Sequence, residues 1–138
     1  PTDEYIAAAN RETFIVVQIE QASSLEQVEA IAAVPGVDFL MLGPADFTVL
    51  SGIPGQFDSE RVQNAMQRIA AAARNAGIHW AATCPTPRHI ERALEMGARF
   101  ICHGADILHD KRGLEQIRKE CLSLGFTFDG TAESRVKL

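Results

Sequence analysis

The stretch Val37-Asp38-Phe39-Leu40-Met41-Leu42-Gly43-Pro44-Ala45-Asp46 decides how we interpret this chain. Its short, mostly apolar run ends at a Gly-Pro turn, a pattern typical of a β-strand that is buried on both faces. Asp46 then follows directly after the strand's C-terminal end. The earlier stretch Phe14-Ile15-Val16-Val17-Gln18-Ile19-Glu20 repeats the arrangement, because it too is apolar and ends in a carboxylate. If the two strands are parallel neighbours, about 4.8 Å apart, both carboxylates project from the same edge of one sheet.

The composition is that of an ordinary globular protein. With 138 residues, of which 46% are hydrophobic and 22% charged, the chain is long enough for one domain with its own core. The net charge of −5 argues against a nucleic-acid partner, and no apolar run approaches the ~20 residues that span a membrane. Three cysteines at irregular spacing favour reduced thiols over disulfides, so we expect a cytoplasmic protein.

Strand and helix patterns alternate along the chain. We expect strands at 14–19, 37–42, 78–82 and 99–103, each followed by a helical pattern. Alternating βα units predict an α/β fold with a parallel sheet and right-handed crossovers. Four units suit either a small open sheet or half of a (β/α)₈ TIM barrel, which needs ~250 residues when complete. We expect this domain to cover residues 1–128 and a polar tail to follow at 129–138.

Two local patterns make more detailed predictions. Ser23 followed by Glu26 matches a capping box and predicts a helix that opens at Ser23. The stretch 47–57 contains two glycines and a proline, and it predicts a long turn outside the core, on the same side as Asp46. Loops on this face of a barrel commonly cover the active site, so we expect the turn to form one wall of the substrate pocket.

Glu20 and Asp46 are candidate ligands of one hard divalent cation. Mg²⁺ and Mn²⁺ prefer a few protein carboxylates and fill their other positions with water and substrate oxygens. Such an ion is a Lewis acid for a bound carbonyl group. The alternative is that each carboxylate merely caps the helix after it, and the spacing alone does not separate the two readings. Gln18 shares the face of Glu20, where it either hydrogen-bonds a substrate oxygen or is simply a polar residue at the sheet edge.

Other polar groups at the expected strand ends are weaker candidates. The backbone N–H groups of Ala45 and Asp46 follow a Gly-Pro pair, and such a turn can bind an anion. We expect His103 to be a hydrogen-bonded structural histidine, and we place His89 on a helix surface. Cys84 has no evident basic partner, so we interpret it as lining the pocket rather than as a nucleophile.

Four short motifs occur together in this chain: Val-Gln-Ile-Glu at 17–20, Pro-Gly-Val-Asp at 35–38, Gly-Pro-Ala-Asp-Phe at 43–47 and Met-Gly-Ala-Arg-Phe at 96–100. In combination they resemble the HpcH/HpaI family of class II pyruvate aldolases, over about Tyr5 to Gly125. The resemblance implies a (β/α)₈ barrel in an oligomer, of which this chain matches only strands five to eight. It also implies a carbon–carbon lyase acting on pyruvate and an aldehyde, as 4-hydroxy-2-oxoheptanedioate and 2-dehydro-3-deoxyglucarate aldolases do.

The resemblance also implies roles for individual residues. Glu20 and Asp46 match the family's metal ligands, and Gln18 matches a substrate-contacting glutamine. The backbone of Ala45 and Asp46 matches the segment that grips the pyruvate carboxylate. The implied cofactor is a divalent metal ion, Mg²⁺ or Mn²⁺, with Co²⁺ as a further candidate. The family's catalytic arginine and its acid–base histidine belong to the half that this chain does not match, so neither role is assigned here.

Three functional hypotheses stay open. The first is the metal-bearing half of a pyruvate aldolase. The second is a relative that uses the same site to decarboxylate a β-keto acid such as oxaloacetate, or a citrate-lyase-like enzyme. The third is a non-catalytic barrel half that acts as a binding or scaffold chain. Because half a barrel leaves two open sheet edges, we expect a fragment, a homo-oligomer or pairing with a chain that carries the N-terminal half. No nucleic-acid or membrane partner is expected.

Overall fold

The computed structural model describes residues 1–128, so the polar tail expected at 129–138 lies outside the described residues. The chain divides into two compact units, Pro1–His103 and a second that begins at Gly104. The second unit contains α7 (Asp106–Ser123). The elements of the first unit are α1 (Thr2–Glu12), β1 (Val16–Ile19), α2 (Ala22–Glu26), α3 (Val28–Ala32), β2 (Phe39–Leu42), α4 (Pro44–Leu50), α5 (Glu60–Asn75), β3 (His79–Thr83), α6 (Pro87–Glu95) and β4 (Phe100–Cys102).

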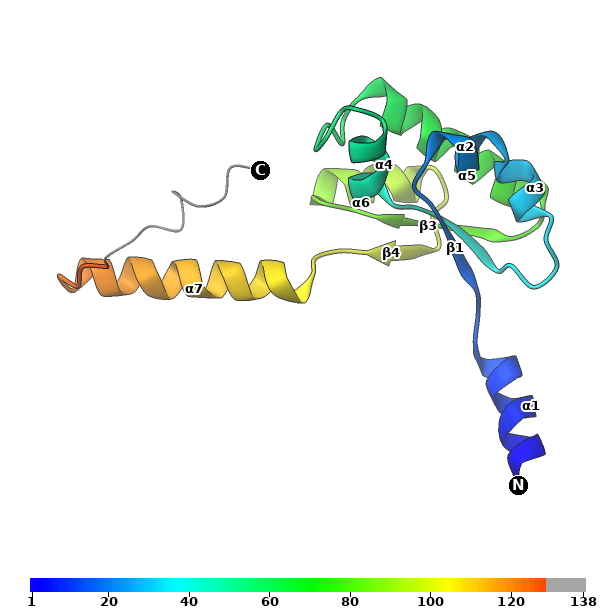
Figure 1. Cartoon of the computed structure of the whole chain (residues 1–138), viewed down its shortest axis with the longest axis horizontal. Helices are drawn as coiled ribbons and strands as arrows, with labels where there is room; N and C mark the ends of the chain where they lie inside the picture. Colours follow the sequence, from blue (N-terminus) through cyan, green and yellow to red (C-terminus); the bar gives the residue numbers. More distant parts are fainter. Residues whose placement is uncertain (129–138) are drawn as a thin grey trace. The chain divides into compact units, whose positions relative to one another are not determined.

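The strands of the first unit form one parallel sheet in the order β1-β2-β3-β4 (Figure 1). Ile19 of β1 pairs with Leu42 of β2, which in turn pairs with Ala82 of β3. A bond of 3.1 Å from the Gly43 N–H to the Ile19 carbonyl continues the first ladder beyond the strands. The prediction of a parallel sheet in sequence order is therefore confirmed, and the C-terminal ends of β1 and β2 lie level with each other.

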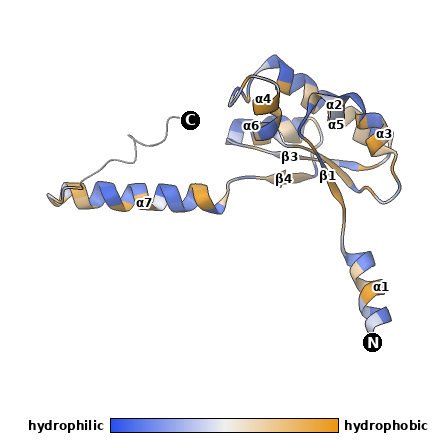
Figure 2. Cartoon of the chain, in the orientation of Figure 1, coloured by the Kyte–Doolittle hydropathy of each residue, from blue (hydrophilic) through white to orange (hydrophobic). Residues whose placement is uncertain are grey.

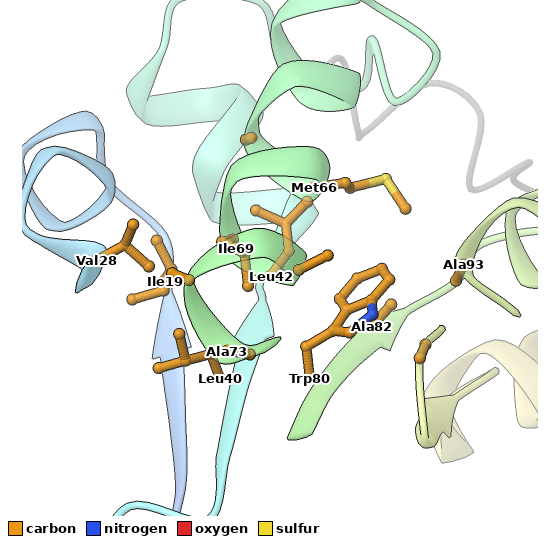
Figure 3. Close-up of a cluster of buried hydrophobic side chains, with 14 of the residues drawn as sticks. Ile19, Val28, Leu40, Leu42, Met66, Ile69, Ala73, Trp80, Ala82 and Ala93 are labelled. Atoms are coloured by element: carbon orange, nitrogen blue, oxygen red, sulfur yellow. The ribbon is translucent and has the colours of Figure 1, made fainter. Parts of the chain in front are cut away.

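Helices α2 to α6 lie on the same face of this sheet (Figure 1). Alternate strand residues point toward them and form the core with residues of α3, α5 and α6. The labelled residues of this core in Figure 3 are Ile19, Val28, Leu40, Leu42, Met66, Ile69, Ala73, Trp80, Ala82 and Ala93. Helices on one face only are typical of the wall of a barrel, whereas a doubly wound sheet has helices on both faces.

The opposite face of the sheet carries an aromatic cluster toward the N-terminal ends of the strands. The rings of Phe14 and Phe39 lie 5.5 Å apart, and the ring of Phe100 lies 6.0 Å from that of Phe39. The ring of His79 lies 5.5 Å from that of Phe39, at a tilt of 46°. Phe14 and Phe100 remain 56% and 37% exposed, so this apolar face is only partly buried within the described chain.

Helix α5 makes a large contribution to the core. Ser59 caps it, because its side chain accepts a bond from the Val62 N–H at 3.4 Å. One stripe of apolar residues at helical spacing is buried, and each large member contributes roughly 2 kcal/mol to folding. Its residues are Val62, Met66, Ile69, Ala70 and Ala73.

The prediction of a long turn at 47–57 was wrong for residues 47–50. Residues 47–50 belong to α4, where Gly43 is the N-cap and Pro44 occupies the first helical position, at which a missing N–H costs nothing. Phe47 is 1% exposed and Thr48 is fully buried, so both belong to the core. The glycines of the stretch suggested a loop, but they lie only in its second part.

Thr48 joins α4 to the loop that follows. Its hydroxyl donates to the Ala45 carbonyl at 2.8 Å and accepts from the Gly55 N–H at 3.2 Å. Gly52 and Gly55 both have positive φ, 75° and 74°, which favours glycine at these two positions. The loop is therefore held by specific bonds to a buried side chain.

The predicted capping box at Ser23 was also wrong. The helix begins at Ala22 with Gln21 as N-cap, so Ser23 lies inside the first turn and makes no cap bond. The helical pattern is then interrupted at Gln27, whose φ and ψ are −105° and 12°, which separates α2 from α3. The buried residues of this pair are Val28 and Ala32, both in α3.

Two polar clusters connect helices of the first unit. Arg68 of α5 binds Glu29 of α3 through two bonds of 3.2 and 3.1 Å, and it also donates to the Glu26 carbonyl at 3.1 Å. The hydrogen bond from Arg68 lowers the pKa of the Glu29 carboxyl group. Both side chains remain about half exposed, at 43% and 57%, so solvent weakens this pair.

The second cluster corrects the prediction for His89. This residue is only 8% exposed, because α6 packs on the segment that precedes α5. Its Nδ1 lies 2.7 Å from the Thr86 hydroxyl and its Nε2 lies 3.6 Å from Asp58 Oδ1. Arg92 donates to the same Asp58 oxygen at 3.3 Å. One face of α6 is thus tied to the loop before α5.

Helix α7, considered by itself, has hydrophilic and hydrophobic residues interspersed along its length (Figure 2). Gly104 precedes it with a φ of 83°, and a side chain at that position would approach the His109 ring to 2.6 Å. Among residues 1–128, no helix combines the length and the apolar character needed to cross a membrane.

Candidate functional site

Gln18 and Glu20 lie together at the C-terminal end of β1. Gln18 points away from the helix-covered face that holds Ile19, as the period of two in a strand requires. Its Nε2 donates to Glu20 Oε1 at 2.5 Å. The predicted common face of these two side chains is therefore confirmed, and the bond restricts the orientation of the carboxylate.

Gly43 provides the space that this pair occupies. A Cβ at residue 43 would collide with Gln18 Nε2 and would lie 2.7 Å from both Cγ and Oε1 of Glu20. The φ of Gly43 is −92°, which any residue adopts, so the missing side chain is the requirement and not the backbone conformation. Sequence reasoning had linked this glycine only to the approach of an anion. The signal that it missed is the pairing of Ile19 with Leu42, which brings β1 beside residue 43.

Asp46 lies in the first turn of α4, four residues after the end of β2, and its side chain is exposed. The first backbone bond of this helix joins the Phe47 N–H to the Gly43 carbonyl at 3.0 Å. The N–H groups of Ala45 and Asp46 precede it and therefore have no acceptor within the helix. The joint binding of a cation by Glu20 and Asp46, and of an anion by these N–H groups, stays a prediction.

The donor set at this edge suits a hard cation. Within residues 1–128, no group of three or more His, Cys, Asp or Glu side chains is arranged to hold a metal ion. An ion held by Glu20 and Asp46 would thus have two protein carboxylates and take its other oxygen ligands from water or substrate. Mg²⁺ and Mn²⁺ accept such an arrangement, whereas a structural zinc site needs four protein ligands.

Two residues at the ends of β3 and β4 have structural roles. His103 was predicted to be a hydrogen-bonded structural histidine, and its Nδ1 lies 2.6 Å from the Cys84 carbonyl. Cys84 does not line the pocket as predicted, because it is 1% exposed and belongs to the core. Burial raises the pKa of the Cys84 thiol, and the nearby Cys102 raises it further.

Comparison with known proteins identifies the family. The family model described as HpcH/HpaI aldolase/citrate lyase matches residues 2–109. The chain belongs to this family. A hydroxypyruvate/pyruvate aldolase from Paraburkholderia phytofirmans is 38% identical over 120 residues, which cover 87% of this chain and 46% of the relative. A 4-hydroxy-2-oxovalerate aldolase from Novosphingobium aromaticivorans is 41% identical over 106 residues, covering 74% of this chain and 39% of the relative.

Solved structures of HpcH/HpaI proteins have the same fold. An HpcH/HpaI aldolase from Desulfitobacterium hafniense superposes with a TM-score of 0.74 at 25% identity, over 94% of this chain and 49% of that one. A family protein from Burkholderia cenocepacia has a TM-score of 0.74 at 33% identity, over 87% and 47%. The chain therefore spans about half the length of its relatives, and its sheet corresponds to half of their TIM barrel, as predicted.

The segment expected to form one wall of the substrate pocket includes the last residues of α4, 47–50. Val49 and Leu50 are 59% and 61% exposed, whereas Phe47 of the same helix is buried. Both residues follow the turn that carries Asp46. Their contact with an aldehyde stays a prediction.

Proposed function

We propose that this chain is the metal-bearing half of a divalent-metal-dependent aldolase that forms or cleaves a bond between pyruvate and an aldehyde. The observation that carries the proposal is the Gln18–Glu20 pair, seated at the sheet edge in the space left by Gly43. The names of the HpcH/HpaI relatives support the reaction class.

Glu20 and Asp46 would hold the cation, Mg²⁺ or Mn²⁺ with Co²⁺ as a further candidate. A carboxylate has about four lone-pair positions, so the bond from Gln18 leaves most of the Glu20 acceptor capacity for the ion. When bound, the cation would supply Lewis-acid stabilisation of negative charge on the oxygens of a 2-oxo acid. The role of Gln18 is to hold the Glu20 carboxylate in one orientation, which preorganises the site.

The backbone of α4 would position the substrate. Its unpaired N–H groups at Ala45 and Asp46 are donors for the carboxylate of pyruvate. The exposed Val49 and Leu50 on the same helix would contact the aldehyde. The proposal requires an arginine and an acid–base histidine from outside residues 1–128, contributed by a further segment or by a partner chain that completes the barrel.

The proposal is tested with this chain in a completed barrel, whether a further segment or a partner chain supplies the other half. Deuterium exchange at the pyruvate methyl group, followed by NMR, measures enolisation without the need to know the aldehyde. We expect exchange to depend on added Mg²⁺ or Mn²⁺ and to fall at least a hundredfold in Glu20→Gln, because a removed metal ligand affects the charge that develops in the transition state. Calorimetric titration with Mn²⁺ should show the same loss of affinity.

Glu91→Gln is the matched control, because Glu91 is an exposed glutamate of α6 outside the site. It should leave both exchange and Mn²⁺ affinity unchanged. Metal-independent exchange, or Mn²⁺ affinity that is equal in Glu20→Gln and the unmodified protein, would contradict the proposal. Cleavage of citrate without enolisation of pyruvate would instead favour a citrate-lyase-like reaction.

A further inference from the structure

A cavity of about 600 Å³ lies at the edge of the sheet opposite to Glu20. Its walls are the last turns of α5 and α6 and the residues that lead into β3 and β4. Two consecutive helices, the strand between them and the segment before β4 thus form these walls. Its volume falls within the usual range for small-molecule sites.

Positive charge predominates around this cavity. Arg74 and Arg99 line it, together with a single carboxylate, Glu95. The ion pairs found among residues 1–128 involve none of these three side chains. Arg74 lies in the last turn of α5, where a cation offsets the helix dipole. The dipole does not account for Arg99, which precedes β4 and lies on a different segment.

The floor of the cavity is apolar. Trp80 is 3% exposed, and its indole N–H is already satisfied by the Met96 carbonyl at 3.1 Å. It therefore offers no hydrogen bond to a ligand. Ile78 and Met96 lie beside it and pack against the core, each partly buried. A ligand that fits this cavity needs an apolar part as well as a negative charge.

We propose that this cavity binds a small organic anion, a carboxylate or a phosphate monoester, separately from the catalytic site. Arg74 and Arg99 hold the anionic group through charge-assisted hydrogen bonds. The apolar part of the ligand packs on Ile78 and Met96 above Trp80. Glu95 at the same cavity disfavours ligands of high negative charge and selects for a single anionic group.

The sequence offers a direct reporter of binding, because Trp80 is its only tryptophan. The full 138-residue chain is titrated with phenyl phosphate and with benzoate, and Trp80 fluorescence and calorimetry are recorded. Phenol serves as the uncharged control. We expect a saturable change with at least one of the two anions and none with phenol. The stronger of the two anions identifies which acidic group the cavity prefers.

Four variants locate the site. Arg74→Gln and Arg99→Gln should each weaken binding about tenfold, since each removes a charge-assisted contact. Arg118→Gln removes the same charge from α7, outside the cavity, and should leave the affinity within about twofold. Glu95→Gln should strengthen binding severalfold. The substituted side chains are all exposed, so circular dichroism should show an unchanged fold.

The proposal is overturned if neither anion binds or if phenol binds as tightly as the anions. It is equally overturned if Arg118→Gln weakens binding as much as Arg74→Gln and Arg99→Gln do, because the attraction would then be a general charge effect. None of these outcomes bears on the catalytic proposal, which is measured by pyruvate exchange and depends on residues at the other edge of the sheet.

Discussion

At the scale of single residues, Gly43 determines whether Glu20 can take up its position. The space beside β1 at this point accommodates either a side chain at residue 43 or the Gln18–Glu20 pair, but not both. The atoms that would be displaced are mostly the ends of flexible side chains. A substitution here should therefore move the carboxylate rather than unfold the sheet.

Gly43→Ala tests this argument. We expect at least a tenfold loss of Mn²⁺ affinity and of pyruvate exchange in the completed barrel, with a small change in melting temperature, because the φ of −92° suits alanine. Gly113→Ala is the control, since nothing lies within 4 Å of a Cβ at that position in α7. It should keep full activity and stabilise the helix by roughly 0.5–1 kcal/mol. Unchanged metal affinity in Gly43→Ala would show that Glu20 does not need the space.

Cys84 provides a second test at this scale. Its raised pKa keeps the thiol protonated at neutral pH, and its burial blocks access, so it should be a poor nucleophile. Native protein treated with iodoacetamide should be labelled at the partly buried Cys121 well before Cys84, as measured by peptide mass spectrometry. Denatured protein should be labelled at both. Equal native rates would contradict the core position of Cys84.

The sequence was sufficient to predict the residues of the candidate site, but not the glycine that leaves space for them. The period of two placed Gln18 and Glu20 on one face, and the structure brings them into contact. The role of Gly43 depends on a neighbouring strand, so no local pattern contains it. Cys84 and His89 were misplaced for the same reason, because their burial depends on segments distant in sequence. Cys84 is bonded through its backbone to Cys102 and His103, and His89 packs against the segment before α5.

At the scale of elements, α4 and its loop form one connected unit. The buried hydroxyl of Thr48 is bonded on both sides, to a carbonyl of its own helix and to the N–H of Gly55. This explains how a glycine-rich segment stays close to the helix that carries Asp46. It also explains the wrong prediction, since a threonine within an apparent turn gives no sign of being buried.

Thr48→Val should separate the loop from α4. The substitution keeps the shape but removes both hydrogen bonds, so we expect a loss of about 1 kcal/mol in unfolding free energy. Limited proteolysis should show faster cleavage between Gly52 and Gly55, while α5 stays protected. If stability falls and the loop remains resistant, the hydroxyl stabilises α4 alone.

The contact between α3 and α5 predicts a dependence on pH. Arg68 lowers the pKa of Glu29 in the folded chain. The contribution of the Glu29–Arg68 pair to the free energy of unfolding is therefore complete at pH values above the ordinary carboxyl range. It is lost as the pH falls through the folded pKa of Glu29. The difference in melting temperature between the native chain and Arg68→Gln should thus be largest near neutral pH and shrink in acid.

Added salt should also reduce this difference, since both side chains are about half exposed. An NMR titration of the Glu29 carboxyl group should show its pKa rising in Arg68→Gln. A difference in melting temperature that persists unchanged at acid pH would mean that Arg68 acts through packing and through its bond to the Glu26 carbonyl.

At the scale of the whole molecule, the described sheet is incomplete on two sides. β1 and β4 each pair with one neighbour only, and the aromatic face at Phe14 and Phe100 is partly exposed. Both features match a barrel half whose inner face is covered by other strands. The alternation of strands and helices was sufficient to predict a parallel sheet, because this depends on periodicity and chain order rather than on particular contacts. The choice of a barrel half over a small open sheet came from the resemblance to the HpcH/HpaI family.

The chain by itself should therefore bind the dye ANS and sediment as more than a monomer, because exposed strand edges and apolar faces associate. Addition of a separately produced N-terminal half of an HpcH/HpaI relative should reduce both effects. Phe100→Ser should lower ANS binding, whereas Ser123→Ala at the end of α7 should not. A monomer that does not bind ANS would show that the inner face is covered from within the chain.

The strand order β1-β2-β3-β4 also has a consequence for folding during synthesis. During synthesis on a ribosome, each new strand finds its partner already present, since the neighbour in the sheet is also the previous strand in the chain. No strand has to wait for one made much later, as it would in a sheet with interleaved order. The sheet can therefore form one βα unit at a time during synthesis. The strand at its free edge is always the partner of the next strand to leave the ribosome.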